Sequence, residues 1–509
     1  IRIYSRSLVL LLTTAINECF PGAQVNVGYA GPDGSFYCAL TNRAPFSQDE
    51  LDIIEAHMRR LVEADHPIRK QVVSLEDAKA LFEARGDADK VRLLENRERD
   101  HLTLYTLRNR YDYYFGYMTP STGCLGLFKL IHVGDGFYLQ HPTQDNPNGL
   151  RPLNVDSKII TVFREAENWL RCMQVEDIGR LNSAVRYDQV QELILVAEAL
   201  HEQRIAAIAT DICERHKHQG VRLVLIAGPS SSGKTTFAKR LAIQLLAHGL
   251  RPFTLELDNY FVDRERTPRD ANGNYDFEAI EAVDLPLFNT QLAALVRGER
   301  VQLPRFDFVR GRSSPGRQAA LTHEQIVIIE GIHGLNPRLV YSIPPDNLYR
   351  IYISPLTALN IDRHNRVPTT DVRLLRRIVR DAATRGNSAT TTLERWASVR
   401  AGEKRNIFPY QDNADALFNS GLVYELAALR SLVEPLLLQV EPGTAAHIEA
   451  KRLLSFLGWV QPLSQAKQAL IPDISLLREF IGGSVFQDYH PADLQTAPLN
   501  EHNHAGLVG

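Results

Sequence analysis

The chain has 509 residues, of which 44% are hydrophobic and 23% are charged, so it can bury more than one hydrophobic core and we expect two or three domains. Its net charge of -3 excludes a global basic field that would by itself suggest coating of nucleic acid or attachment to anionic membranes. The five cysteines lie far apart without a C-x-x-C pair, which argues against a zinc knuckle or a disulfide framework and predicts a reducing, cytoplasmic location. The apolar run Leu8–Leu12 is too short to span a bilayer, so no membrane association is predicted.

Residues 1–150 are predicted to form an α+β module. Its first helix covers Leu8–Cys19, and strands at Gln24–Tyr29 and Ser35–Leu40 are separated by a Gly-Pro-Asp-Gly turn. The segment Ser47–Glu50 begins with Ser and ends with Glu, which is the pattern of a capping box before an amphipathic helix.

This module resembles the second, editing-associated domain of threonyl-tRNA synthetases. The resemblance rests on Phe46–Leu51, Asp65–Ile68, Glu76–Phe82, Thr119–Gly123 and Phe128–Leu130. In that family two His, a Cys and a further His form the hydrolytic pocket, and the aligned positions here hold Leu10, Thr14, Tyr114 and Met118. No ligand or general base remains at these positions, so the resemblance implies a retained fold without editing chemistry. We predict that the module packs on the rest of the chain; assisting oligomerisation and sensing RNA or a small molecule remain alternatives.

The rest of the chain divides into three parts. Residues 151–217 are predicted to be a helical connector, because apolar side chains recur there at spacings of three and four. Strands and helices alternate over residues 218–430, which is typical of a parallel sheet covered by helices on both faces. Residues 431–509 are predicted to be a helical extension that ends in a polar, mobile tail.

A phosphate-binding loop is the strongest chemical signal. The apolar strand Leu223–Ala227 is followed by G-x-x-x-x-G-K-T and then by a helix. Glycines in this order let backbone N–H groups turn toward phosphate oxygens, while the helix presents its positive end. Lys234 is expected to reach the β and γ phosphates of a nucleoside triphosphate, and Thr235 is expected to hold Mg²⁺. The predicted cradle comprises Gly228, Ser230, Ser231, Ser232, Gly233, Lys234, Thr235 and Thr236.

Two carboxylates follow apolar strands of the same region. Asp258 ends the strand at Thr254–Leu257, and Glu330 ends the strand at Gln325–Ile329. Asp258 is placed to accept a proton from an acceptor hydroxyl or to hold water on Mg²⁺, and Glu330 to ligate Mg²⁺ through water. Simpler explanations also exist, namely a helix cap for Asp258 and a strand-end ion pair for Glu330.

A predicted helix at Asp371–Asp381 carries an arginine stripe. Arg373, Arg376, Arg377 and Arg380 recur at i, i+3, i+4 and i+7, so we expect the four guanidinium groups on one helical face. Such a stripe is usually a solvated surface. The nucleotide-binding loop by itself leaves kinase, ATPase and GTPase open, but no Asn-Lys-x-Asp motif of a GTPase is present.

Together these stretches resemble the uridine kinase and phosphoribulokinase family. The resemblance implies an ATP- and Mg²⁺-dependent kinase that phosphorylates a nucleoside 5′-hydroxyl, with the arginine helix as a lid over the transferring group. It assigns catalysis to Asp258, Lys234, Arg377 and Arg380 and phosphate contact to Arg380 and Arg385. It also implies substrate contacts for Asp258, Tyr260, Phe306 and Arg377, and ribose binding by Asp276 within Asp270–Glu278.

The positions that read the base depart from the family pattern. Phe306 stands at the family's Tyr, Gly311 at its His and Asn387 at its Arg. A pocket that loses hydrogen-bond partners for one base edge changes or relaxes base choice, so uridine is the leading hypothesis among nucleosides.

Two alternatives to a nucleoside kinase remain. The first is a phosphoribulokinase-type acceptor such as a sugar phosphate, for which Arg264, Arg266 and Arg269 supply basic side chains. The second is an RNA-associated regulatory protein in which ATP acts as a switch, and this alternative predicts steeply salt-dependent tRNA binding. Apart from this second alternative, nucleic acid is not predicted as a partner. Formation of a homo-oligomer is possible.

Overall fold

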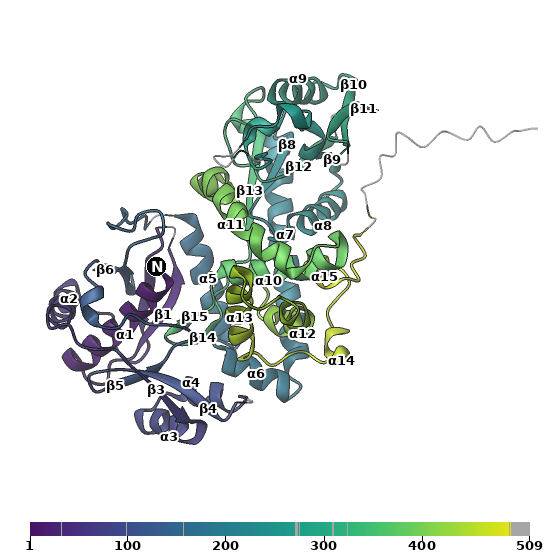
Figure 1. Ribbon diagram of the computed structural model, residues 1–509. Helices are drawn as coiled ribbons and strands as arrows, with labels where there is room; N and C mark the ends of the chain where they lie inside the picture. Colours follow the sequence, from purple (N-terminus) through teal and green to yellow (C-terminus); the bar gives the residue numbers. More distant parts are fainter. Residues whose placement is uncertain are drawn as a thin grey trace, which may run out of the picture.

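The protein is described here by a computed structural model (Figure 1). It describes residues 1–489 apart from Pro32, Glu98, Asp156, 270–272, Asn274, 308–309, His323 and Asp488. The predicted tail after Pro491 and parts of the Asp270–Glu278 segment therefore lie outside the described residues.

The N-terminal module is α+β, as the sequence predicts. Helices α1 (Arg2–Cys19) and α2 (Gln48–Glu63) pack on an antiparallel sheet in the order β1-β2-β7-β6. These strands are β1 (Val25–Ala30), β2 (Phe36–Leu40), β6 (Lys129–Val133) and β7 (Gly136–Gln140). A second sheet, β3-β4-β5, carries two further helices; its elements are β3 (Arg69–Ser74), α3 (Leu75–Arg85), α4 (Ala88–Leu94), β4 (His101–Leu107) and β5 (Arg110–Tyr113).

The predicted capping box begins α2. Ser47 Oγ accepts from the Glu50 amide at 3.2 Å, and Glu50 Oε2 accepts from the Ser47 amide at 2.9 Å. Two amide groups of the helix start are satisfied in this way, which confirms the local prediction.

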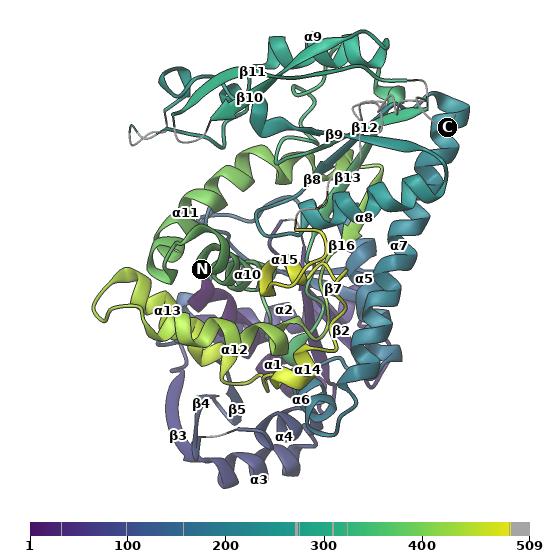
Figure 2. The ribbon, with the colours of Figure 1, turned by 90° about the vertical axis from the view of Figure 1, so that its right-hand side faces the viewer.

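Three helices connect the module to the second lobe: α5 (Lys158–Cys172), α6 (Ile178–Arg186) and α7 (Val190–Gln219). Helix α7 has 30 residues and runs along much of the length of the molecule (Figure 2). It ends at Gly220, which adopts φ +74° and lets the chain turn into the first strand of the next sheet.

The second lobe is built on a five-stranded parallel sheet in the order β16-β13-β8-β12-β9. Its strands are β8 (Leu223–Ala227), β9 (Arg251–Glu256), β12 (Gln325–Glu330), β13 (Leu348–Ser354) and β16 (Ala416–Asn419). Alternate residues of β8 enter different cores: Val224 and Ile226 face α7 and α8 (Lys234–Ala247), whereas Leu223 and Leu225 face α9 (Leu285–Val296). Both faces of the sheet are therefore covered, as predicted from the alternation of strands and helices.

Several further elements surround this sheet. A hairpin of β10 (Val301–Asp307) and β11 (Arg312–Ala319) lies at its far end, and α10 (Thr369–Arg385) and α11 (Ala389–Asn406) lie below it in Figure 1. The short 3₁₀ helices are η1 (Thr122–Cys124), η2 (Leu257–Tyr260), η3 (Arg264–Arg266), η4 (Ile280–Ala282), η5 (Pro345–Asn347) and η6 (Phe408–Asn413).

The C-terminal extension is helical and is part of the main core. It contains α12 (Glu425–Leu438), α13 (Ala445–Leu457), α14 (Gln465–Gln468) and α15 (Arg478–Ile481). Leu476, Leu477 and Phe480 are fully buried in the hydrophobic cluster that also holds residues of α8 and α10.

The two lobes are joined through a small hairpin of β14 (Asn360–Asp362) and β15 (Asn365–Arg366). The Val27 amide of β1 donates to the Arg363 carbonyl at 2.7 Å, so this hairpin extends the contacts of the N-terminal sheet. A buried charge network lies behind it, in which Lys90 Nζ contacts Asp112 at 2.8 Å and Asp362 at 3.1 Å. The N-terminal module thus packs on the second lobe. Within the described residues, none of the helices has the length and apolar character needed to cross a membrane.

Candidate functional site

The loop after β8 has the backbone geometry of a phosphate cradle. Gly233 adopts φ +85° and Ser231 adopts φ +60°, which turns successive amides toward the inside of the loop. A Cβ atom at Gly228 would overlap the Ile353 carbonyl oxygen of β13, so glycine is required there for close backbone packing. The Ser231 and Ser232 hydroxyls are buried and have no hydrogen-bond partner within the described residues.

Lys234 lies over this loop. Its Nζ donates to the Gly228 carbonyl at 3.0 Å and to the Pro229 carbonyl at 3.3 Å. Burial lowers the pKa of Lys234, and the negative charges of Glu330 and Glu479 oppose that lowering. An ammonium group at this position, together with the unpartnered serine hydroxyls, fits a polyphosphate ligand.

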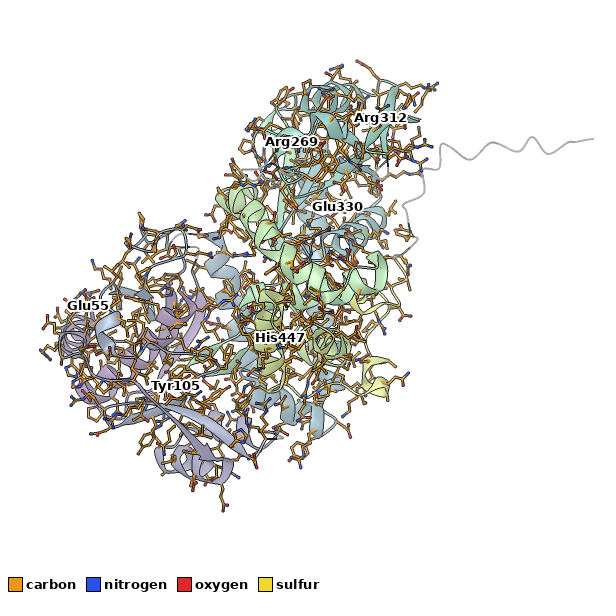
Figure 3. All side chains as sticks on the ribbon, viewed as in Figure 1. Glu55, Tyr105, Arg269, Arg312, Glu330 and His447 are labelled. Carbon is orange, nitrogen blue, oxygen red and sulfur yellow. The ribbon has the colours of Figure 1, made fainter. Side chains whose placement is uncertain are left out.

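Glu330 and Thr235 meet beside the lysine. Thr235 Oγ1 donates to Glu330 Oε1 at 2.8 Å, and Figure 3 shows Glu330 where the sheet meets the helical body of the molecule. Burial raises the pKa of Glu330, and the Lys234 charge and the Thr235 hydrogen bond oppose the rise. The hydroxyl and the carboxylate are oxygen donors of the kind that Mg²⁺ prefers, and Mg²⁺ in nucleotide sites usually keeps waters and few protein ligands. The residues present therefore fit Mg²⁺, although no cluster of three or more His, Cys, Asp or Glu suited to a metal occurs in the described chain.

Asp258 lies at the same edge of the sheet, just after β9. Its side chain is exposed at the mouth of the site, yet loss of surrounding water raises the pKa of Asp258, and the charges of Lys234 and Arg385 oppose the rise. The register pairs Glu330 with Glu256 of β9 and with Ile226 of β8, so the carboxyl ends of the three strands coincide. Lys234, Glu330 and Asp258 are thus brought together, as the sequence predicts from the strand ends.

The arginine stripe of α10 divides into two pairs, which differs from the expected single face. Arg373 and Arg376 are 1% and 0% exposed; the first pairs with Glu403, and the Arg376 Nε donates to Glu425 at 2.7 Å. Two of the four guanidinium groups are therefore buried ion pairs of the core. Helix α10 packs against α11, α12 and α15.

The other arginines of α10 lie at the loop. Arg377 donates to the Ser230 hydroxyl at 2.8 Å, and its Nε lies 3.2 Å from Asp381. Arg380 pairs with the same Asp381 at 2.8 Å, and Arg385 approaches it at 3.6 Å. Asp381 therefore gathers three arginines next to the phosphate loop, where they can meet an anionic group.

Two predicted substrate contacts lie inside the protein. Tyr260 is 1% exposed, packs edge-on against Phe288 and donates its hydroxyl to Gln291 at 2.9 Å, so the prediction that it binds substrate is corrected: it is a core residue. Phe306 is buried against Phe261 with a ring distance of 5.8 Å, which leaves its ring little surface for a base.

The predicted ribose ligand Asp276 lies on a loop beside the end of α11. Its Oδ2 accepts from Arg405 at 3.0 Å, and its Oδ1 accepts from the Glu278 amide at 3.2 Å. Glu278 itself was missed by sequence reasoning. Burial raises the pKa of Glu278 and the negative charge of Glu403 adds to the rise, whereas the charges of Arg377 and Lys234 oppose it. The one feature of the sequence that could have indicated a role for Glu278 is its position two residues after Asp276.

The family comparison agrees with this geometry. The model of the phosphoribulokinase / uridine kinase family matches residues 223–427. This region is a phosphoribulokinase/uridine kinase family domain. The chain therefore contains a P-loop kinase domain of the phosphotransferase class, whose matched region begins at β8 and ends within α12.

The N-terminal region is similar to threonine–tRNA ligases. The chain is 32% identical to the enzyme of Oleidesulfovibrio alaskensis over 128 residues, which is 25% of this chain and 20% of that protein. It is 35% identical to the enzyme of Maricaulis maris over 130 residues, again 25% of this chain and 20% of that protein. The chain thus spans about a fifth of the length of these curated relatives. Leu10 and Tyr114, at two of the positions where the resemblance implies an editing pocket, belong to the apolar core of the module.

Solved structures of kinases also resemble parts of the chain. A possible uridine kinase from Bacillus stearothermophilus is 24% identical, has a TM-score of 0.22 and covers 26% of this chain and 70% of its own. A D-glycerate 3-kinase from Cryptococcus neoformans var. grubii is 16% identical, has a TM-score of 0.24 and covers 52% of this chain and 89% of its own.

A residue from outside the region matched by the family model contacts the phosphate loop. Glu479 of α15 accepts from the Thr236 hydroxyl at 2.9 Å, although the two residues are 243 positions apart. Sequence reasoning missed this contact, because no local pattern connects the C-terminal extension with the phosphate loop.

Proposed function

We propose that the kinase domain transfers the terminal phosphoryl group of MgATP to the 5′-hydroxyl of a nucleoside. The observation that carries this proposal is the meeting of Lys234, Glu330 and Asp258 at one edge of the parallel sheet. A pure nucleotide switch needs the lysine and the magnesium ligands, but it does not need a further carboxyl group at the mouth of the site.

Each residue then has a defined task. The backbone N–H groups of the loop from Ser230 to Thr236 and the Lys234 ammonium would hold the phosphates, and Thr235 and Glu330 would hold Mg²⁺, which would neutralise charge on the phosphates when bound. Asp258 takes the proton of the acceptor hydroxyl as its oxygen forms a bond to the γ phosphorus. The bond from that phosphorus to the bridging oxygen breaks, and ADP leaves with the electron pair.

The arginines of α10 stabilise the transferring group. Arg377 and Arg380 lie next to the loop and already share Asp381. A shared carboxylate orients guanidinium groups before the substrate arrives, so that less side-chain entropy is lost when negative charge develops on the phosphoryl oxygens. Arg385 extends the same group toward the mouth of the site, and Asp276 with Glu278 supplies carboxylates for sugar hydroxyls.

One observation favours a second acceptor class, a sugar phosphate. Gly311 stands at the position where uridine kinases carry a base-contacting His, and the side chain of Arg264 lies so close to it that a Cβ there would overlap the guanidinium. An arginine over the base-reading position favours an anionic acceptor over an uncharged base edge.

A screen of acceptors tests the proposal. Radiolabelled ATP is incubated with each common nucleoside and with several sugar phosphates, and Lys234→Ala serves as the blank. A labelled nucleoside monophosphate is the expected product. A labelled sugar bisphosphate would select the second acceptor class instead, and the absence of any product would exclude both and favour the RNA-associated alternative.

Asp258→Asn tests the proposed base. The variant keeps the size of the side chain and the ATP contacts but cannot take a proton, so we expect turnover to fall by roughly 100-fold or more with unchanged ATP affinity. Turnover within about threefold of the parent would remove Asp258 from this role. Steady-state kinetics with the acceptor found in the screen gives both values.

A further inference from the structure

The C-terminal extension forms one wall of the phosphate loop. Leu476 lies so close to Gly233 that a Cβ atom on this glycine would overlap the leucine side chain. Ser475 donates to Glu198 of α7, and the Arg376 guanidinium lies 5.0 Å from the centre of the Phe480 ring. Because these side chains are buried, the segment is fixed at the loop by packing on both sides of Glu479.

Glu479 places a carboxylate at the start of α8. Its Oε2 accepts from Thr236 Oγ1 at 2.9 Å and from the Thr236 amide at 3.3 Å. Thr236 belongs to the first turn of the helix, where amides have no partner within the helix and the helix dipole is positive. In a phosphate-binding loop such amides donate to phosphate oxygens, so Glu479 holds a position that a nucleotide phosphate also requires.

A second carboxylate at the loop, that of Glu403, is held in place by ion pairs and serves as a comparison. Glu403 of α11 accepts from the Ser230 amide at 3.0 Å. It is 1% exposed, and both of its oxygens are paired, one with Arg373 and the other with Arg400 at 3.1 Å. Removing Glu403 from this position would leave two buried or half-buried arginines without a partner, which is costly.

Glu479 has no such partners. It is half-buried, and it forms no ion pair with any residue that the structure describes. Among the described residues, its carboxylate accepts hydrogen bonds only from Thr236, so rotation of this one side chain releases both of them. Burial and the neighbouring arginines lower the pKa of Arg385, and the negative charges of Asp381 and Glu479 oppose this lowering, so Arg385 is a cationic group near Glu479.

We propose that, before a nucleotide binds, the Glu479 carboxylate occupies the place of one of its phosphates. When a nucleotide enters, its phosphates displace this carboxylate from Thr236. The side chain rotates toward Arg385 while Leu476 and Phe480 stay packed. Glu479 thereby lowers nucleotide affinity and satisfies the helix start when no nucleotide is bound. The inference rests on the proposed function only through nucleotide binding to the loop, and the identity of the acceptor does not enter it.

The test compares Glu479→Gln with Asp473→Asn in the full chain. Both changes remove one negative charge from the same segment, but Asp473 is exposed and its ion pair with Arg478 is long, at 3.7 Å. Dissociation constants for MgATP and for adenosine are measured by titration calorimetry. We expect Glu479→Gln to bind MgATP roughly tenfold more tightly, equivalent to about 1.4 kcal/mol, with unchanged affinity for adenosine, which has no phosphates. Asp473→Asn should match the parent for both ligands.

Several outcomes would overturn the proposal. Weaker binding of MgATP by Glu479→Gln would make Glu479 a ligand of the bound state, and an equal change for adenosine would make its effect unrelated to phosphate. Glu479→Asp is the second variant: its shorter side chain retracts the charge from Thr236, so we expect tighter MgATP binding here too, and unchanged affinity would contradict displacement. Thermal unfolding without nucleotide checks that each variant is folded.

The same measurements separate this inference from the proposed function. A parent protein that binds MgATP but phosphorylates no nucleoside would contradict the nucleoside kinase and leave the displacement intact. Kinase activity with unchanged MgATP affinity in both Glu479 variants would contradict the displacement alone.

Discussion

Gly233 is subject to two constraints at once. Its φ of +85° lies in the left-handed region that favours glycine, and its Cα faces Leu476 without room for a Cβ atom. The first constraint belongs to the phosphate loop and is visible in the sequence motif. The second belongs to the C-terminal extension and appears only when the fold is known.

Gly233→Ala should therefore damage both the loop and its wall. We expect a clear loss of thermal stability and at least about 100-fold weaker MgATP binding, because the strained backbone and the displaced Leu476 both change the positions of the loop amides. Gly249→Ala is the matched control, since Gly249 also has a positive φ of +82° but has open space around its Cα. The control should lose some stability and keep MgATP affinity; equal loss of binding in both variants would contradict the account. Titration calorimetry and thermal unfolding give the two quantities.

The acid limb of the pH profile reports on Asp258. Loss of water raises the pKa of this carboxyl group above the ordinary value for aspartate of about 4. A general base works in its deprotonated form, so kcat/KM should rise with pH through the raised pKa, and the limb should lie at higher pH than for an aspartate in water. The residual activity of Asp258→Asn should lack this limb. A limb that persists unchanged in the variant belongs to another group, for which Glu330 is the first candidate.

Strands with strong local signals were predicted closely, whereas the polar hairpin was not. Strands β8 and β12 agree with their predicted ranges because each is an apolar run bounded by a turn residue or a carboxylate. The β10–β11 hairpin was not predicted, because β11 is exposed along most of its length and shows no apolar alternation. The arginine stripe of α10 has the predicted spacing, but spacing cannot distinguish a solvated face from buried ion pairs whose partners, Glu403 and Glu425, lie on other helices.

The β14–β15 hairpin depends on a buried charge network at the lobe boundary. Lys90 is 1% exposed and contacts both Asp112 and Asp362, while His364 contacts Asp112 at 2.7 Å. The surrounding positive charges hold the pKa of Asp112 well below its usual range despite burial. The sequence shows no pattern for this network, because its members come from α4, β5 and the hairpin.

Lys90→Met should destabilise the protein by about 3–5 kcal/mol, since it leaves two buried carboxylates without their shared cation. The measurement is chemical or thermal unfolding of the full chain. Lys79→Met is the control: its pair with Glu83 spans 3.9 Å at the surface, so its removal should change stability by less than about 1 kcal/mol. Similar losses for the two variants would show that the buried network contributes no more than a surface pair.

At the scale of the molecule, one core crosses the expected domain boundaries. The same hydrophobic cluster contains Phe82 of the N-terminal module, Ile205 of α7, Val224 of the kinase sheet and Phe456 of the extension. Composition and length predict several domains, and the family match locates one of them, but neither reveals that their cores are continuous. The reason is physical: the apolar faces of α7 and α10 have the same periodicity whether they cover one domain or join two.

A continuous core predicts a single unfolding transition. Calorimetry of the full chain should show one cooperative peak, and a fragment of residues 151–509 should be poorly soluble or much less stable, because the surface that α4 and α6 share becomes exposed. Two well-separated transitions, with a fragment as stable as the full chain, would contradict the shared core.

The wall that Leu476 and Glu479 form has a consequence for synthesis of the protein. The glycine loop leaves the ribosome long before the segment that completes it, so a growing chain carries the motif without a finished cradle. Products of premature termination before this segment should therefore hold the loop less rigidly, because Leu476 no longer packs on Gly233, and they also lack the carboxylate of Glu479 that competes with nucleotide phosphates.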